Sequence, residues 1–176
     1  MQREIEVKVL NIDIDEMKEK LESHGAKLIN HEFQKNYTFK PVGDKGFDNG
    51  YLRLRETTYE DKAHKDRELT FKEVKEVNDV RINNEYTVNI DSVTMMIKIF
   101  QFLGVELEYE GHKERISYSY KGQRFDIDIW DKKTYPDPYM EIEFTNQSKI
   151  DEIIDDLDID RSNVTNKSIT ELRESL

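Results

Sequence analysis

Short stretches in which apolar and charged residues strictly alternate constrain the fold of this chain more than any other feature. In EIEVKV, residues 4–9, the spacing of two places Glu4, Glu6 and Lys8 on one face of an extended strand and the β-branched residues on the other. For this stretch alone, an amphipathic strand with its charged face in water is a sufficient explanation. The rest of the sequence decides whether the charged face has a further purpose.

The same alternation recurs along the chain and predicts eight strands, seven of them with one charged face. The further strands are expected at residues 33–40, 51–56, 68–74, 81–90, 112–120, 124–130 and 140–144. The charges are sorted by strand, because Arg53 and Arg55 share a face in YLRLRE, whereas Glu141 and Glu143 share one in MEIEF. Independent water-facing strands would carry a looser mixture of polar residues. The sorting therefore favours strands whose charged faces meet one another.

Like charges two residues apart repel, and an oppositely charged neighbouring strand or a bound ion relieves this repulsion. Closing the strands into an antiparallel barrel achieves this, and about eight strands can leave a lumen lined by both charge signs. Helical periodicity and capping residues predict helices at residues 13–25, 92–103 and near 148–157, and a short one from Ser168. We therefore expect an α+β fold: one domain, residues 1–176, built as an eight-stranded antiparallel β-barrel with flanking helices.

Composition argues against several classes of partner. The chain has 38 acidic and 27 basic residues and a net charge of −11, which disfavours a surface for nucleic acid polymers. It contains no cysteine, so a metal would need oxygen ligands. No apolar run resembles a signal peptide or has the length of a membrane span. We expect a cytoplasmic protein without a nucleic acid or membrane partner, and its oligomeric state is not indicated.

A lumen lined by both charge signs could hold a metal ion and an anion together. Magnesium takes oxygen ligands and keeps waters while it bridges phosphates, which suits the glutamates of the first and last strands, Glu4, Glu6, Glu141 and Glu143. Phosphate oxygens would be bound by seven basic groups: Lys8, Arg53, Arg55, Lys72, Arg81, Lys113 and Arg115. So many positive charges suit a ligand with about four or five negative charges, such as a triphosphate.

The first strand, residues 4–8, also matches an ExExK motif, and LRLRE, LTFKEV, HKERISY, FDIDIW, MEIEF and NKSITELRESL follow in order. In these motifs the chain resembles the CYTH superfamily, the triphosphate tunnel metalloenzymes, over nearly its whole length. The resemblance implies an eight-stranded tunnel that binds a triphosphate with Mg²⁺ or Mn²⁺. By position it implies a phosphate side, made of the seven basic groups, and a metal side, made of Glu4, Glu6, Asp126 or Asp128, Glu141 and Glu143. Among these, Glu4, Glu6, Lys8 and Lys72 are the candidate catalytic residues.

The chain departs from the family pattern in two places. Thr38 stands where family members tend to carry a tyrosine, and Tyr37 is expected on the opposite face of that strand. The stretch DKKTYPDPYMEIE replaces a shorter turn that contains glycine, and it could alter one mouth of the tunnel.

Several further residues have two interpretations. Glu85, Arg124 and Lys167 are expected either in the tunnel or in structural ion pairs. Trp130 is expected either to pack in the protein or to stack on an organic group at a tunnel mouth. The four histidines are expected at the surface.

Three functions fit these patterns. A hydrolase would cleave inorganic tripolyphosphate or a small organic triphosphate such as thiamine triphosphate, and we favour it because the recognisable residues all concern phosphate and metal. A class IV adenylate cyclase, which converts ATP to cyclic AMP and pyrophosphate, is the alternative and would need a nucleoside pocket that the sequence does not show. A module that binds a triphosphate without catalysis is the third.

Overall fold

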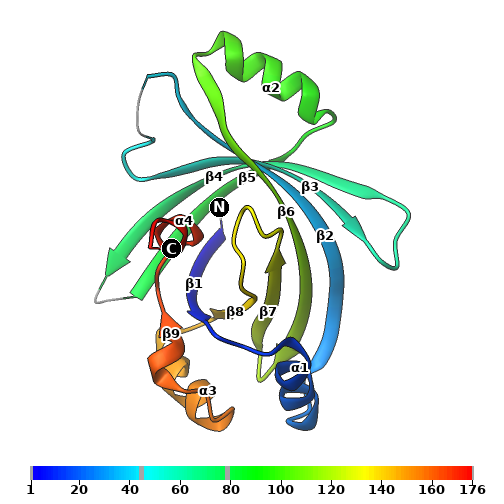
Figure 1. Ribbon diagram of the computed structural model, residues 1–176, viewed down its shortest axis with the longest axis vertical. Helices are drawn as coiled ribbons and strands as arrows, with labels where there is room; N and C mark the ends of the chain where they lie inside the picture. Colours follow the sequence, from blue (N-terminus) through cyan, green and yellow to red (C-terminus); the bar gives the residue numbers. More distant parts are fainter. Residues whose placement is uncertain (1, 44–45, 78–79, 176) are drawn as a thin grey trace.

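The computed structural model describes residues 2–43, 46–77 and 80–175. Within these residues, one antiparallel sheet of nine strands runs in the order β5-β4-β3-β2-β6-β7-β8-β1-β9. The strands are β1 (Gln2–Val9), β2 (Lys27–Pro41), β3 (Gly50–Tyr59), β4 (Lys65–Val77), β5 (Val80–Asn89), β6 (Val105–Tyr120), β7 (Gln123–Trp130), β8 (Tyr139–Phe144) and β9 (Val164–Thr165). A further pairing between β5 and β1 closes the sheet into the barrel that Figure 1 shows. The expected eight-stranded antiparallel β-barrel is confirmed, with β9 as a short addition beside β1.

Strand β1 closes the barrel because it pairs with two different strands. Its first half lies antiparallel to β5, with Glu4 opposite Asn83, and its second half lies antiparallel to β8, with Lys8 opposite Glu141. Pairing along both edges satisfies the backbone N–H and C=O groups that an open edge would leave exposed. It also fixes which face of β1 points into the lumen, since a shift of one residue would reverse the two faces.

Strands β2 and β6 are longer than the alternation predicts. They were expected at residues 33–40 and 112–120, yet they span Lys27–Pro41 and Val105–Tyr120 and pair with each other along most of that length. The added part of β2, residues 27–32, lacks a clear alternation and is kept extended by its hydrogen-bonded ladder. The added part of β6, VELEYE at residues 105–110, does alternate apolar and charged residues, a signal that the expected bounds left out. The register of this ladder shifts between Leu28 and Asn30 and again between Thr38 and Phe39, where Glu108 of β6 is left without a partner in the ladder.

Four α-helices accompany the barrel within the described residues: α1 (Ile14–Ser23), α2 (Val93–Phe102), α3 (Ile150–Asp156) and α4 (Ile169–Glu174). Short 3₁₀ turns, Gln147–Lys149 and Arg161–Asn163, flank α3. Asp13 and Ser92 accept hydrogen bonds from backbone N–H groups of the first turns of α1 and α2. Helix α4 begins with a reciprocal capping box between Ser168 and Glu171. Among the described helices, none has the length and apolar character that crossing a membrane requires.

The hydrophobic core lies outside the lumen, between the apolar strand faces and the helices. The larger cluster joins Phe125, Ile127 and Ile142 of the barrel to Leu21 of α1 and Ile153 of α3. A smaller cluster packs Phe39 and Leu54 against Phe100 of α2, which lies at the opposite end of the molecule from α1 and α3 (Figure 1). Because helices cover the apolar faces, the charged faces are left to line the interior.

Candidate functional site

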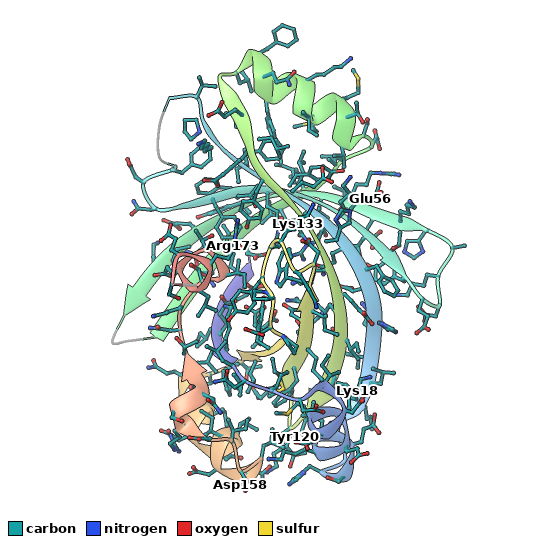
Figure 2. All side chains as sticks on the ribbon, in the orientation of Figure 1. Lys18, Glu56, Tyr120, Lys133, Asp158 and Arg173 are labelled. Atoms are coloured by element: carbon teal, nitrogen blue, oxygen red, sulfur yellow. The ribbon has the colours of Figure 1, made fainter. Side chains whose placement is uncertain are left out.

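The charged strand faces enclose a cavity of about 910 Å³ inside the barrel. Helix α4, whose Arg173 is labelled in Figure 2, contributes part of its lining from Ser168 to Glu174. Among the side chains that the structure describes, seven basic residues line it: Lys8, Arg53, Arg55, Lys72, Lys113, Arg115 and Arg124. Eleven described acidic residues also line it: Glu4, Glu6, Glu32, Asp48, Glu68, Glu85, Glu108, Glu141, Glu143, Glu171 and Glu174. The structure therefore brings most of the sequence-predicted site residues into one cavity.

The glutamates of β1 and β8 are neighbours because the two strands pair. Glu6 lies opposite Glu143, and Lys8 lies opposite Glu141. Lys8 Nζ is 3.1 Å from Glu141 and 3.4 Å from Glu6. Burial opposes a charge on Glu141, yet Lys8 and Arg115 hold the pKa of this carboxyl well below its usual range. Part of the acidic wall is thus already compensated.

Lys72 of β4 reaches across to the same wall. Its Nζ lies 2.9 Å from Glu4, 3.3 Å from Glu6 and 3.1 Å from Glu85. Although burial disfavours the charged amine, Glu6 and its neighbours hold the pKa of Lys72 well above its ordinary value. Lys72 is therefore a permanent positive charge beside the carboxylates.

Glu143 is the carboxylate that this arrangement leaves uncompensated. Among the described residues it has no hydrogen bond or ion pair, and burial together with Glu4 and Asp126 raises the pKa of Glu143 to about 8. Burial also raises the pKa of Glu4, despite Lys72 nearby. Buried carboxylates that repel one another have the chemistry of a donor set for a hard cation such as Mg²⁺ or Mn²⁺.

These carboxylates are not already gathered around one point. Within the described part of the chain, no group of three or more histidine, aspartate or glutamate side chains is arranged to hold a metal ion. Lys8 and Lys72 each bridge two or more of the glutamates and thereby keep them apart. The donor types fit a divalent cation, and their final arrangement would require these lysine contacts to change.

Arg115 forms a closed network with the aspartates of β7. Asp128 accepts hydrogen bonds from Arg115 Nε at 2.6 Å and Nη2 at 2.7 Å, and from Lys113 Nζ at 2.8 Å. Asp126 lies 2.7 Å from Arg115 Nη1 and also accepts from Arg124 Nε at 2.9 Å. Both aspartates are fully buried and neither lines the cavity. The structure places them behind Arg115 rather than among the cavity-lining glutamates.

Arg53 and Arg55 on β3 contrast with Arg115. Arg53 Nε is buried without a hydrogen-bond partner, and the ion pair that Arg53 forms with Glu85 is long at 3.9 Å. Arg55 Nε donates to Asn36 at 2.9 Å, but among the described residues no carboxylate pairs with this guanidinium. Burial, with Arg53 and Arg115 nearby, lowers the pKa of Arg55 to about 10. Arg55 thus faces the cavity without a carboxylate partner among the described residues, and Arg53 has only the long contact to Glu85.

Lys113 lies between the Arg115 network and Arg55. Burial and the adjacent Arg115 lower the pKa of Lys113 to about 7, although Asp128 lies 2.8 Å away. Its Nζ also lies over the ring of Trp130, 5.2 Å from the ring centroid. An anion in the cavity would favour the charged form of this amine.

The structure shows the surroundings of the residues for which the sequence allowed two interpretations. Glu85 and Arg124 line the cavity and also form ion pairs, whereas Lys167 is exposed and does not line it. Trp130 lines the cavity and packs with Tyr135 and Tyr139. The side chain of Arg81 lies outside the described residues, although its backbone pairs with Glu6.

The predicted departure at Thr38 agrees with the structure. Thr38 lines the cavity, whereas Tyr37 packs against the cluster under α2. The histidines lie at the surface except His31, which is partly buried between Glu60 at 2.7 Å and Glu114 at 2.8 Å.

Sequence reasoning missed several uncharged residues of the cavity wall. Asn36, Tyr51 and Tyr109 line the cavity, and Asn36 positions Arg55 through its hydrogen bond. Asn36 lies two residues before Thr38, so strand alternation assigns it to the same face. That signal was available, but an uncharged polar residue is a weaker indication of chemistry than a charged one.

Comparison with known proteins supports the fold. A protein of Pyrococcus horikoshii, PH1819, superposes with a TM-score of 0.79 at 20% identity, and 98% of each chain is covered. A candidate adenylate cyclase from Vibrio parahaemolyticus gives a TM-score of 0.73 at 12% identity, again over 98% of each chain. The Hippeastrum protein HpAC1, said to reveal a dominant triphosphatase activity, gives 0.70 at 13% identity over 99% of this chain and 96% of that one.

No curated protein matches the chain in sequence. A family model, the CYTH domain, matches residues 2–170, which is nearly the whole chain. The motif order, the closed eight-stranded barrel and its charged interior agree with that match. The chain belongs to the CYTH family.

Proposed function

We propose that this protein hydrolyses a triphosphate with the help of Mg²⁺ or Mn²⁺. The observation that carries the proposal is that one cavity holds both weakly compensated guanidinium groups and an unpaired carboxyl group. Among the described residues, Arg55 has no carboxylate partner, Arg53 has only a long contact to Glu85, and Glu143 has no ion pair. A ligand that satisfies both must bring negative charge and a cation together. A triphosphate with a divalent metal has that composition.

We propose that Glu4, Glu6, Glu141 and Glu143 would hold the metal and that Arg53, Arg55, Lys72 and Lys8 would bind phosphate oxygens. Bound Mg²⁺ or Mn²⁺ would supply neutralisation of the charge on those oxygens. Arg115 would contribute from its fixed position, because Asp126 and Asp128 set the direction of its guanidinium. We therefore propose a positioning role for these aspartates in place of metal ligation.

The residues next to Lys72 support hydrolysis. Lys72 lies on β4 opposite Tyr51 of β3, and Arg53 and Arg55 follow on the same face of β3, so three positive groups gather at one part of the cavity. Positive groups fixed in this way would stabilise the charge that develops on a phosphoryl group during its transfer to water. The Hippeastrum relative with dominant triphosphatase activity is consistent with this choice.

Adenylate cyclisation remains the second candidate, because a Vibrio relative carries that candidate assignment. Incubation of the pure protein with tripolyphosphate, thiamine triphosphate and ATP, with Mg²⁺ or Mn²⁺, separates the two. The proposal expects orthophosphate as the main product. If cyclic AMP and pyrophosphate form from ATP faster than orthophosphate forms from tripolyphosphate, the hydrolase proposal is wrong and the protein is an adenylate cyclase.

The metal side is tested by substitution of one carboxylate. We expect Glu143→Gln to remove metal-dependent activity, because it replaces a carboxyl group that a bound cation would ionise with a neutral amide of the same shape. Turnover at limiting Mg²⁺ is the measurement, and circular dichroism controls for folding. Near-normal turnover of this variant at limiting metal would show that the glutamate side does not hold the metal.

A further inference from the structure

Helix α2 carries apolar side chains on two sides, although the barrel covers only one of them. Its inner side chains, Met96, Ile97 and Phe100, pack against the strand residues Phe39 and Leu54. Its outer apolar side chains form a second stripe at helical spacing that ends at the C-cap: Met95, Ile99, Phe102 and Leu103. At 100° per residue, the two stripes together span roughly 220° of the helix, about twice the arc that one packed face needs. So wide an apolar arc is typical of a helix that is covered on both sides.

Two strand residues extend the outer stripe. Val42 lies beside Leu103, because the Val42 backbone N–H donates to the Gly104 carbonyl at 2.8 Å. Leu107 lies opposite Phe39, the residue that α2 covers. We call the six exposed residues the α2 patch: Val42, Met95, Ile99, Phe102, Leu103 and Leu107. Each of them is at least 45% exposed, and Phe102 is 92% exposed, so the single chain leaves the whole patch in water.

The α2 patch has the size of one side of a stable protein interface. Its exposed fractions correspond to roughly 700 Å² of surface, and each partner of a standard complex buries about 800 Å². The largest apolar patch on a typical monomer is smaller, about 300–600 Å². Helix α2 also lies at one end of the molecule (Figure 1), where a second protein can approach it without meeting the helices at the other end.

The charges of α2 indicate which partner fits the patch. The chain has a net charge of −11, yet Val93–Phe102 contains no acidic residue and carries Lys98 as its single charge. Two copies of the chain can therefore bring their α2 helices together without facing acidic groups. A membrane surface fits less well, because amphipathic helices that bind lipid carry many lysines and arginines and because anionic lipids repel an acidic protein.

The outer stripe of α2 is also complementary to itself. Met95 and Leu103 each lie four residues from Ile99, one on either side. A twofold axis through Ile99 therefore places Met95 of one copy against Leu103 of the other when the two helices lie antiparallel. We infer that the α2 patch binds a second copy of this chain, in a symmetric dimer joined by antiparallel α2 helices. Because no residue of α2 lines the cavity, the dimer does not depend on the proposed function.

Sedimentation velocity over a range of micromolar protein concentrations tests the dimer. We expect a species with twice the 21.0 kDa mass of the chain. Ile99→Lys places two like charges at the twofold axis and should raise the dimer Kd roughly 30-fold or more, the effect of losing an interface hot spot. Phe33→Lys, which changes an exposed apolar residue of β2 outside the patch, is the matched control and should leave the Kd unchanged.

A pair of opposite charges tests the antiparallel arrangement. Met95→Glu and Leu103→Lys should each weaken the dimer, because each variant buries a charge without a partner. In the double variant the two charges meet across the interface, so it should bind itself roughly tenfold or more tighter than either single variant. Positions eight residues apart are two turns apart on one helix and cannot pair within one copy. Circular dichroism confirms that each variant keeps the wild-type secondary structure.

A wild-type monomer at every concentration would overturn the inference, as would a dimer that Ile99→Lys leaves intact. A monomer that floats with neutral phosphatidylcholine vesicles, and that no longer does so after Ile99→Lys, would overturn it in favour of a membrane surface. A double variant that binds itself no tighter than the single variants would contradict the antiparallel arrangement. Hydrolysis of tripolyphosphate by Ile99→Lys should equal that of the wild-type protein, so the dimer and the proposed function fail separately.

Discussion

Two arginine regions of the same barrel wall differ in how their charge is compensated. Arg115 on β6 forms ion pairs with Asp126, Asp128 and Glu141. Burial disfavours its charge, but these carboxylates outweigh the effect of burial and raise the pKa of Arg115 well above its ordinary value. Arg55 on β3 faces the same cavity but has an amide as its partner, and its pKa falls to about 10. The same residue type therefore serves two purposes. The matched arginine belongs to the structure, and the unmatched one is available to a ligand.

The largest expected effect breaks the matched region. Asp128→Asn keeps the shape of the side chain but leaves Arg115 and Lys113 buried with one fewer anion. Removal of one partner from a buried ion pair costs about 3–5 kcal/mol of unfolding free energy. Urea denaturation at pH 7 measures it, with Asp151→Asn on the exposed face of α3 as the control. A loss no greater than that of the control would mean that the network does not organise the barrel.

The next effect tests the unmatched region. Arg55→Met removes a buried charge that has no carboxylate partner among the described residues, so the unfolding free energy should stay the same or rise. Binding of tripolyphosphate should weaken by roughly 1.5–3 kcal/mol, the range for hydrogen bonds to charged groups. Calorimetry at constant Mg²⁺ gives the affinity. A variant that loses stability but keeps its affinity would reverse the roles assigned to the two arginines.

Lys113 sharpens the comparison through pH, because it lies between the two regions. Its folded pKa of about 7 is below the unfolded value, so the unfolded chain binds more protons above pH 7. The unfolding free energy of the ligand-free protein should therefore rise by about 2–3 kcal/mol between pH 6 and pH 9 relative to that of Lys113→Met. Denaturation at several pH values measures this difference. No relative change over this pH range would show that Asp128 keeps Lys113 fully protonated and would contradict the lowered pKa.

The smallest expected effect lies outside the cavity. Burial opposes protonation of His31, but hydrogen bonds to Glu114 and Glu60 raise the pKa of this imidazole. Its folded pKa is raised, so its contribution is complete below the unfolded pKa of about 6.5 and is lost as pH rises through the folded value. The unfolding free energy of the wild-type protein should fall by about 0.2–1 kcal/mol as pH rises through this range, and that of His31→Gln should not change. Equal pH profiles for the two proteins would show that the pair contributes nothing.

The sequence predicted the barrel and most of its charged lining because strand alternation reports which side chains share a face. Glu4, Glu6 and Lys8 follow from a period of two, as do Arg53 and Arg55. Alternation does not report which strands are neighbours or how far their register is shifted. The contacts of Asp126 and Asp128 with Arg115 depend on that register. For this reason the sequence did not distinguish these two aspartates from the glutamates of the cavity wall.

The contacts around Trp130 could not be predicted from the sequence, because they depend on the three-dimensional path of the chain. Gly111 and Thr134 are distant along the chain, and their close approach follows from the path of the segment between β7 and β8. Gln34 and Asn36 were counted as part of a strand, but only the three-dimensional hydrogen-bond pattern shows that each has a free polar atom. The sequence did raise stacking as one interpretation of Trp130 and left packing open beside it.

The central claim is that the cavity binds a triphosphate and a divalent metal as a unit. Titration calorimetry of the wild-type protein with tripolyphosphate, in Mg²⁺ and in EDTA, tests it most directly. The account predicts one saturable site in Mg²⁺ and binding at least tenfold weaker in EDTA, because the eleven acidic residues of the lining outnumber its seven basic ones. Absence of binding in Mg²⁺, or equal affinity in EDTA, would contradict it.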